Sequence, residues 1–441
     1  MKTRLLLVCA SFLLVISGCA GPATKVEKTE RAKIARAEQN YRPKEARPQL
    51  PVLTADSELK DFVKYAVLNS PRVEEAFYQW KSTVEAINAS KYPANPQLSL
   101  LDFDSVIDSL MPGVMFMVPA PGKLSLSGEA AALEAGKTGH IFEGEVLKTA
   151  FRVKELSYQS WVLKEKIKLT EEILQILRMQ ENVSLARVKT NEASLLDPIT
   201  IQIEKEKLAN MLADFKDSEK VLTAQFGAAL GILQSDRIPK PMAALPFTES
   251  GFSEKEIWES VQAKNPRLAL LRSTIEQSEV YVKLAYKEQW PDFNIGLMQG
   301  LFSGMALTRP LLSISIPWPG KSASQVAASK SAVKMTEAAF SAEELDLAAG
   351  LADGLFRWRQ ADREVKLYRE NLLPKSRAAT QIAQSGYRTG KTGLADFLNA
   401  ERTFLDFSVN YLSAQGLREI TLNEISLSIA GVSPEKEDLF R

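Results

Sequence analysis

The sequence has very few of the residues that bind metals or carry acid–base chemistry. Among 441 residues there is one histidine, His140, and there are two cysteines, Cys9 and Cys19. A zinc site needs several histidine or cysteine ligands, and a serine-type triad needs a histidine base, so one chain is expected to hold neither. No grouping of nucleophile, base and orienting residue appears, so we expect no enzyme and no bound cofactor or metal.

An excess of positive charge is also missing. Lysine and arginine number 55 against 54 aspartates and glutamates, which gives a net charge of +1. Nothing therefore predicts a nucleic-acid partner. The chain is 45% hydrophobic and 25% charged, and this balance is typical of folded rather than disordered proteins.

Long hydrophobic runs are absent except at the N-terminus, where residues 5–16 are apolar but too short to span a bilayer. Two basic residues precede this run and Ile16-Ser17-Gly18-Cys19 closes it, a pattern typical of a bacterial lipoprotein signal. We therefore expect a signal peptide over 1–18, lipidation of Cys19, and outer-membrane lipid as a partner. Alanine rather than aspartate at position 20 favours the outer membrane. An ordinary signal peptide with a chance cysteine is the alternative.

The chain repeats itself at a spacing of nearly 200 residues. Ser70-Pro71-Arg72 returns as Asn265-Pro266-Arg267, and residues 118–123 (VPAPGK) return as 316–321 (IPWPGK). A spacing that drifts slowly across several such landmarks indicates a tandem duplication. Two copies of one unit predict a pseudo-symmetric protomer that closes into a ring with others.

Each copy is expected to contain the same series of elements. Two short helices, which meet at Pro71 or Pro266, precede two strands with alternating apolar residues. Proline is then absent from residues 124–189, which as one helix would be about 100 Å long. In the second copy Pro374 interrupts the matching stretch 322–388, and we expect a kink there. A returning helix closes each long hairpin.

The turns after the long helices carry the most specific pattern. The second reads Tyr387-Arg388-Thr389-Gly390-Lys391-Thr392-Gly393-Leu394-Ala395-Asp396 and continues Phe397-Leu398-Asn399-Ala400. It resembles the Y-x-x-G-x-x-x-x-x-D-x-L-x-A hairpin tip of TolC-like outer-membrane efflux proteins. The first turn keeps less of the pattern, and Asn191 stands where Gly390 stands. Both residue types tolerate the left-handed backbone that a helix end needs.

The resemblance covers the whole chain after the signal, and the P-x-P-G-K corner is most similar to the heavy-metal efflux branch. It implies a mainly α fold with a small β part: long antiparallel helical hairpins and two β-hairpins, in two tandem repeats. Three protomers would form one tube, an α-barrel continued by a β-barrel. The tube would be a passive outer-membrane exit duct that extends into the periplasm. Its partners would be a periplasmic adaptor (membrane fusion) protein and a proton-driven inner-membrane pump.

These features together predict an order of segments along the chain. They are a signal peptide over 1–18; a lipidated, extended tether over 19–52; repeat 1 over 53–231, with β-hairpin 97–118 and helical hairpin 124–231; a linker over 232–252; repeat 2 over 253–431, with β-hairpin 292–316 and helical hairpin 322–431; and a C-terminal tail over 432–441.

The resemblance also implies that the two hairpin tips form the surface on which the adaptor docks. The candidate docking residues are Thr190, Asn191, Ser194, Asp197, Arg388, Gly390, Gly393 and Asp396. Two interpretations of the two aspartates remain open. They cap the returning helices, since Ser194-Leu195-Leu196-Asp197 has capping-box spacing, or they form an acidic ring that gates a cation path.

A different class of function also remains open. Only 22 residues lie between Pro96 and Pro119, and a membrane strand needs roughly 9–11. The first β-hairpin is therefore barely long enough to span. A periplasmic coiled-coil scaffold lipoprotein that conducts nothing would need the same long helices. The sequence does not specify the exported substrate.

Overall fold

The computed structural model describes residues 21–43, 46, 48–54, 57–99, 113–233, 253–299 and 308–431. The predicted signal peptide, Cys19, residues 234–252 of the linker and the tail 432–441 lie outside the described residues. So do the turns of both predicted β-hairpins, residues 100–112 and 300–307.

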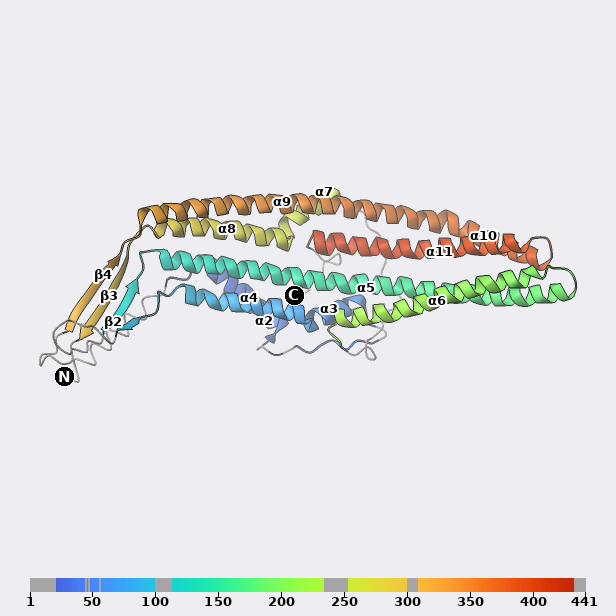
Figure 1. Cartoon of the computed structure of the whole chain (residues 1–441), viewed down its shortest axis with the longest axis horizontal. Helices are drawn as coiled ribbons and strands as arrows, with labels where there is room; N and C mark the ends of the chain where they lie inside the picture. Colours follow the sequence, from blue (N-terminus) through green and yellow to red (C-terminus); the bar gives the residue numbers. More distant parts are fainter. Residues whose placement is uncertain are drawn as a thin grey trace.

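The chain forms one long bundle of helices with a small sheet at one end (Figure 1). The turns that join the long helices into hairpins lie at the opposite end. The predicted mainly α fold with a small β part is confirmed. The helices, in chain order, are α2 (Lys25–Tyr41), α3 (Leu59–Asn69), α4 (Pro71–Ser90), α5 (Lys123–Lys189), α6 (Leu196–Ala229), α7 (Glu254–Lys264), α8 (Pro266–Lys287), α9 (Pro319–Leu367), η3 (Tyr368–Leu372), α10 (Leu373–Arg388), α11 (Leu394–Asn423) and η4 (Glu424–Ile429). Within the described ranges, no helix is both long enough and apolar enough to cross a membrane.

The longest element is α5, a helix of 67 residues. Because no proline interrupts it, one ladder of backbone hydrogen bonds runs for about 100 Å. A helix of this length needs long neighbours to cover its apolar positions. Helix α5 packs against α4 and α8 near the sheet, and against α6 and α11 toward the far end (Figure 1).

Four strands occur in the described part of the chain, and they form one antiparallel sheet in the order β1-β2-β3-β4. The first half of the chain supplies β1 (Gln97–Ser99) and β2 (Gly113–Val118), and the second half supplies β3 (Asp292–Gln299) and β4 (Thr308–Ser315). Pairing between β2 and β3 therefore joins the two halves of the chain. It leaves β1 and β4 as the two edges of the sheet.

The prediction of an extended tether over 19–52 was wrong for its central part, which forms helix α2. Thr24 begins this helix, and its hydroxyl accepts a hydrogen bond from the Glu27 N–H at 3.2 Å. Helix α2 packs on α4 and α5, where Tyr41 joins the core and Glu27 forms a buried ion pair with Lys91 at 2.9 Å. The prolines that suggested extended chain all lie outside residues 25–41. Thr24 and Glu27 stand at capping-box spacing, a signal that the sequence analysis missed.

The expected break near Pro374 is present and begins before the proline. Helix α9 passes into the π-helical turn η3 before α10 begins at Leu373. A proline ring clashes with the carbonyl group four residues earlier, which here belongs to Glu370. Glu370 lies within η3, so the widened turn falls where the clash would occur.

The same corner occurs in both halves of the chain. The side-chain amide of Asn69 donates a hydrogen bond to the Leu230 carbonyl oxygen at 2.8 Å. In the second half, the amide of Asn265 donates to the Ile429 carbonyl oxygen at 2.7 Å. Each long hairpin therefore ends against the pair of short helices that begins its own half.

Candidate functional site

The two hairpin tips lie together at the end of the molecule farthest from the sheet (Figure 1). The candidate docking residues that the sequence singled out are thus brought into one region. All of them lie in or beside the two turns. Asp197 is half-buried, and the others are exposed: Thr190, Asn191, Ser194, Arg388, Gly390, Gly393 and Asp396.

Both tips turn through one residue in the left-handed backbone conformation. Asn191 has φ of +58° in the first tip and Gly390 has φ of +73° in the second. In each tip the chain then closes back on the helix that precedes it. The Glu192 N–H donates to the Arg187 carbonyl oxygen at 2.8 Å, and the Lys391 N–H donates to the Gly386 carbonyl oxygen at 2.8 Å. The expectation that Asn191 and Gly390 play equivalent backbone roles is confirmed.

The predicted capping box at the first tip does not form. The Ser194 hydroxyl accepts a hydrogen bond from the Leu196 N–H at 3.1 Å rather than from Asp197. The Asp197 carboxylate instead accepts a hydrogen bond from the Tyr387 hydroxyl at 3.3 Å. Asp396 stands in the first turn of α11, where the helix dipole favours a negative charge.

Arg187 and Tyr387, which the sequence analysis did not select, connect the two tips. Arg187 Nη1 donates to the Tyr387 carbonyl oxygen at 2.7 Å, and the guanidinium lies 5.2 Å from the centre of the Tyr387 ring. Tyr387 is buried and stacks on Phe397 with ring centres 5.9 Å apart. Burial raises the pKa of the Tyr387 hydroxyl, so it keeps its proton and donates to Asp197. Tyr387 was visible in the tip motif, but nothing in the sequence pairs it with Arg187 and Asp197, which lie about 200 positions away.

An apolar strip lies beside the first tip. Leu195 is 74% exposed, and three further apolar side chains at helical spacing on α6 are also exposed: Leu196, Ile199 and Ile203. Single exposed apolar residues are ordinary, but four neighbouring ones at the end of a hairpin indicate a contact surface.

The sheet at the other end has two different faces. The registers place Val118 opposite Phe293 and Phe293 opposite Ile314, so one face is apolar across three strands. On the other face, the Asn294 amide donates to the hydroxyls of Ser313 and Ser315 at 3.2 and 3.4 Å. The apolar side chains are exposed in spite of their character. One apolar and one polar face is the pattern of a strand pair between lipid and water.

The junction between sheet and helices is held by an ion pair between the two halves. Lys123, at the start of α5, donates to both carboxylate oxygens of Asp292 at 2.8 Å, and Asp292 also accepts from the Ala120 N–H. Lys123 is the lysine of the first P-x-P-G-K corner. That corner therefore fixes the direction in which α5 leaves the sheet.

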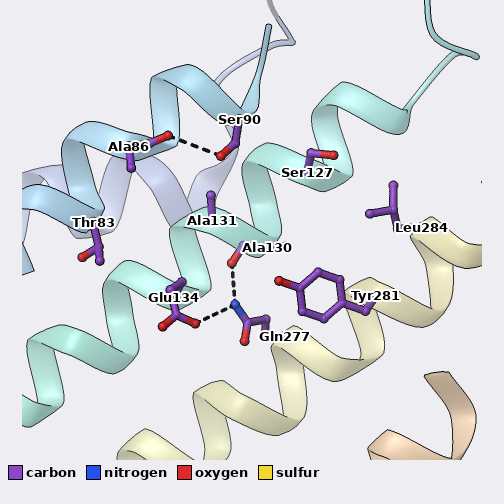
Figure 2. A pocket seen from close by; sticks show the side chains of 10 residues that line it. All are labelled: Thr83, Ala86, Ser90, Ser127, Ala130, Ala131, Glu134, Gln277, Tyr281 and Leu284. Atoms are coloured by element: carbon purple, nitrogen blue, oxygen red, sulfur yellow. Dashed lines mark hydrogen bonds between the residues drawn. The ribbon is translucent and has the colours of Figure 1, made fainter. Parts of the chain in front are cut away.

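Beyond this junction, polar side chains connect α5 and α8 beside a cavity of about 480 Å³ (Figure 2). The amide of Gln277 on α8 donates to the Ala130 carbonyl oxygen at 2.9 Å and to Glu134 at 3.0 Å. Burial would raise the pKa of Glu134, but hydrogen bonds from Lys137 and Gln277 outweigh it and lower that pKa. Within the described parts of the chain, no group of three or more metal-binding side chains occurs here or elsewhere.

These features define a class of protein: an elongated helical channel subunit with a membrane-type sheet at one end and paired hairpin tips at the other. Residues 258–431 match the family described as outer membrane efflux protein. The chain carries a domain of that family, and the resemblance to TolC-like channels is confirmed. It is therefore an outer-membrane efflux channel, the exit duct of a tripartite system.

Known proteins that resemble the chain agree with this assignment. Cobalt-zinc-cadmium resistance protein CzcC of Cupriavidus metallidurans is 22% identical over 352 residues, which cover 76% of this chain and 81% of that protein. A membrane protein from Pseudomonas aeruginosa has a TM-score of 0.72 at 15% identity, and covers 88% of this chain and 99% of its own. The transmembrane channel CusC also has a TM-score of 0.72 at 15% identity, with coverages of 89% and 99%. Channels of the family are trimeric and work with an adaptor and an inner-membrane pump, and the family is one of transporters rather than enzymes.

Proposed function

We propose that this chain is a lipid-anchored, trimeric duct in which the sheet end lies in the outer membrane and the tips receive a periplasmic adaptor. The observation that carries the proposal is the separation of two unlike ends by helices about 100 Å long. One end exposes an apolar sheet face, and the other exposes two turns and an apolar strip. That length suits a conduit across the periplasm and serves no purpose in a compact globule.

Ring closure follows from the way in which the two halves already pair. Strand β2 of the first half pairs with β3 of the second. In the repeat, the free edge β4 is the counterpart of β2, and the free edge β1 is the counterpart of β3. The edge β4 of one protomer would then pair with β1 of the next in the same manner. Val118 faces Phe293 within the chain, so the equivalent pair between protomers is Ile316 with Leu98. Both of these side chains are exposed in the single chain.

The proposed edge pairing predicts a specific disulfide. Side chains directly opposite each other on antiparallel strands have Cβ atoms about 4.5–5.5 Å apart, close enough for a disulfide with slight adjustment. Leu98→Cys/Ile316→Cys should therefore give covalent dimers and trimers on oxidation in membranes, seen on non-reducing gels. Each single variant, and the out-of-register pair Leu98→Cys/Leu312→Cys, should give little cross-linked product. Equal cross-linking in all four variants, or none in the matched pair, would contradict the register.

The lipid anchor would act at the same end as the sheet. The Gly21 N–H donates to the Lys91 carbonyl oxygen at 3.0 Å, and Gly21 lies against Leu124 at the beginning of α5. Cys19 is two residues earlier in the sequence. An acyl group on Cys19 would thus enter the bilayer close to the sheet, and α2 would hold the anchored segment against α4 and α5.

Cys19→Ser should abolish incorporation of radiolabelled palmitate, because the serine hydroxyl does not replace the thiol in lipid transfer. The trimer should still form, since no residue of the sheet is altered. The measurement is autoradiography of the immunoprecipitated protein, with Cys9→Ser as the matched control that keeps its label. Labelling that persists in the Cys19→Ser protein would overturn the anchor assignment.

The cargo proposed for this duct is a heavy-metal cation. CzcC carries cobalt, zinc and cadmium resistance in its name, and the P-x-P-G-K corner points to the same branch. The test is metal resistance and cell-associated metal in a strain that lacks this chain, with plasmid-borne wild type as the control. Zinc, cobalt and cadmium should accumulate only in the strain without the duct. Unchanged accumulation of all three would exclude this cargo.

The alternative of a non-conducting scaffold keeps one supporting observation. Only 22 residues lie between Pro96 and Pro119, and two membrane-spanning strands of roughly 9–11 residues each would use nearly all of them. A scaffold would form the same bundle but carry no current across a bilayer.

A further inference from the structure

A buried acid and a buried amide lie in the helical bundle near the tips. Glu401 on α11 is 3% exposed, and Gln180 on α5 is 0% exposed. Among the residues that the structure describes, neither carboxylate oxygen of Glu401 and neither amide atom of Gln180 has a hydrogen-bond partner. Buried polar groups are nearly always paired, so two unpaired ones in one region indicate a site with a role other than packing.

The two side chains lie at the same level of neighbouring antiparallel helices. Gly416 of α11 lies against Val162 of α5. Toward the tips, Gln180 is 18 residues beyond Val162, and Glu401 is 15 residues from Gly416. At 1.5 Å per residue these two steps differ by about 4–5 Å, less than one helical turn. Gln180 and Glu401 therefore belong to one layer of the interface between the two hairpins.

The core next to this layer is apolar. Leu177, Ile201, Leu398 and Leu405 form the neighbouring core. Several charged groups on the four surrounding helices have partners of their own: Glu181 with Lys205, Glu204 with Arg402, Arg377 with the Phe404 ring, and Arg187 with the Tyr387 carbonyl oxygen. Burial alone raises the pKa of Glu401, to about 7.

We propose that Glu401, in the layer that it shares with Gln180 at the α5–α11 interface, is a buried proton-binding group whose neutral form keeps the two hairpins packed near the tips. With its proton, the carboxylic acid is neutral and leaves no charge in the apolar layer. Without it, an unpaired negative charge remains in an apolar core, and the hairpins separate more readily. One part of this inference rests on the proposed function: if the chain is a duct, separation of the hairpins would open its tip end.

The direction of the pH effect follows from the two protonation states. In a separated bundle Glu401 regains its ordinary pKa of 4.5, whereas in the packed bundle its pKa is about 7. The packed bundle therefore binds more protons, and its stability falls as the pH rises from 4.5 and levels off above 7. Between pH 6 and pH 8.5 the opening equilibrium should rise about tenfold.

Hydrogen–deuterium exchange of the purified trimer in detergent tests the site directly. After correction for intrinsic rates, the amides of residues 394–405 should exchange about tenfold faster at pH 8.5 than at pH 6. Glu401→Gln has nearly the same shape without a titrating proton, so its exchange should be independent of pH. Glu206→Gln removes an exposed carboxylate from α6 at a similar level and should behave as wild type. Equal pH dependence in Glu401→Gln, or none in wild type, would overturn the proposal.

A second variant tests whether the buried charge, rather than the shape of the side chain, loosens the bundle. Glu401→Leu removes the unpaired buried carboxyl group, so residues 394–405 should exchange more slowly than in wild type at pH 8.5 and without pH dependence. Faster exchange than in wild type at pH 8.5 would mean that the carboxyl group stabilises the packed hairpins, and would contradict the proposal. Neither experiment involves the adaptor, the pump or export, so a negative result would leave the proposed function untouched.

Discussion

Gly390→Trp is expected to abolish export while the trimer and its insertion in the outer membrane remain intact. Gly390 has φ of +73°, a conformation that costs a residue with a β-carbon about 1–2 kcal/mol. A β-carbon there would lie 3.4 Å from Arg187 Nη2, so an indole would cover the turn and disturb the contact between the tips. The sheet lies about 100 Å away along the helices, too far to be affected.

The assay pairs metal resistance with detection of the trimer in the same cells. Gly390→Ala separates backbone strain from bulk and should retain most of the resistance. Asn191→Trp should act like Gly390→Trp but more mildly, because the first tip keeps less of the motif. Full resistance in the Gly390→Trp strain would refute a docking role for the tip. Loss of the trimer would show that the turn is needed for folding instead.

Gly296→Leu is expected to abolish both the trimer and membrane insertion. Gly296 lies at the centre of β3, opposite Met115 of β2. A β-carbon on Gly296 would fall 2.6 Å from the Val114 carbonyl oxygen, and a backbone atom cannot move aside as a side chain can. Strands β2 and β3 would have to separate, which disrupts the one pairing that joins the two halves of the sheet.

The matched control is Gly320→Leu at the start of α9, where a β-carbon meets nothing within 4 Å. That variant should form normal amounts of trimer, and a leucine suits a helix better than a glycine. Membrane flotation and gel mobility of unheated samples measure both outcomes. A Gly296→Leu protein that floats with the outer membrane as a normal trimer would show that β2–β3 pairing is not required.

Local sequence signals accounted for the elements and for the backbone of the tips. The lack of proline over 124–189 predicted α5, and the Asn191 and Gly390 positions predicted the left-handed turns. The alternation in 292–316 likewise predicted β3 and β4. Each of these inferences depends on residues that are close in sequence, where periodicity and turn chemistry act directly.

Contacts between distant positions could not be predicted in the same way. A cap on its own helix and a gating ring were the two interpretations open for Asp197, and neither included the hydrogen bond that it accepts from Tyr387 of the other hairpin. Two other features depend on the packing of α5 against the second half of the chain. They are the contact of Arg187 with Tyr387 and the common level of Gln180 and Glu401 along the bundle. Helix α2 was missed for a different reason, because the prolines around it outweighed one weak capping signal at Thr24.

Current through a planar lipid bilayer is the measurement that tests the duct most directly. Purified wild-type trimer should insert and give discrete, uniform conductance steps, whereas the Gly296→Leu protein should give none at the same protein concentration. Flotation of vesicles made with the same preparation verifies that wild-type protein has inserted. Conductance steps would establish a continuous aqueous path through the tube. Inserted trimer that never passes current, at any voltage and at pH 6 or pH 8.5, would contradict the duct and favour the non-conducting scaffold.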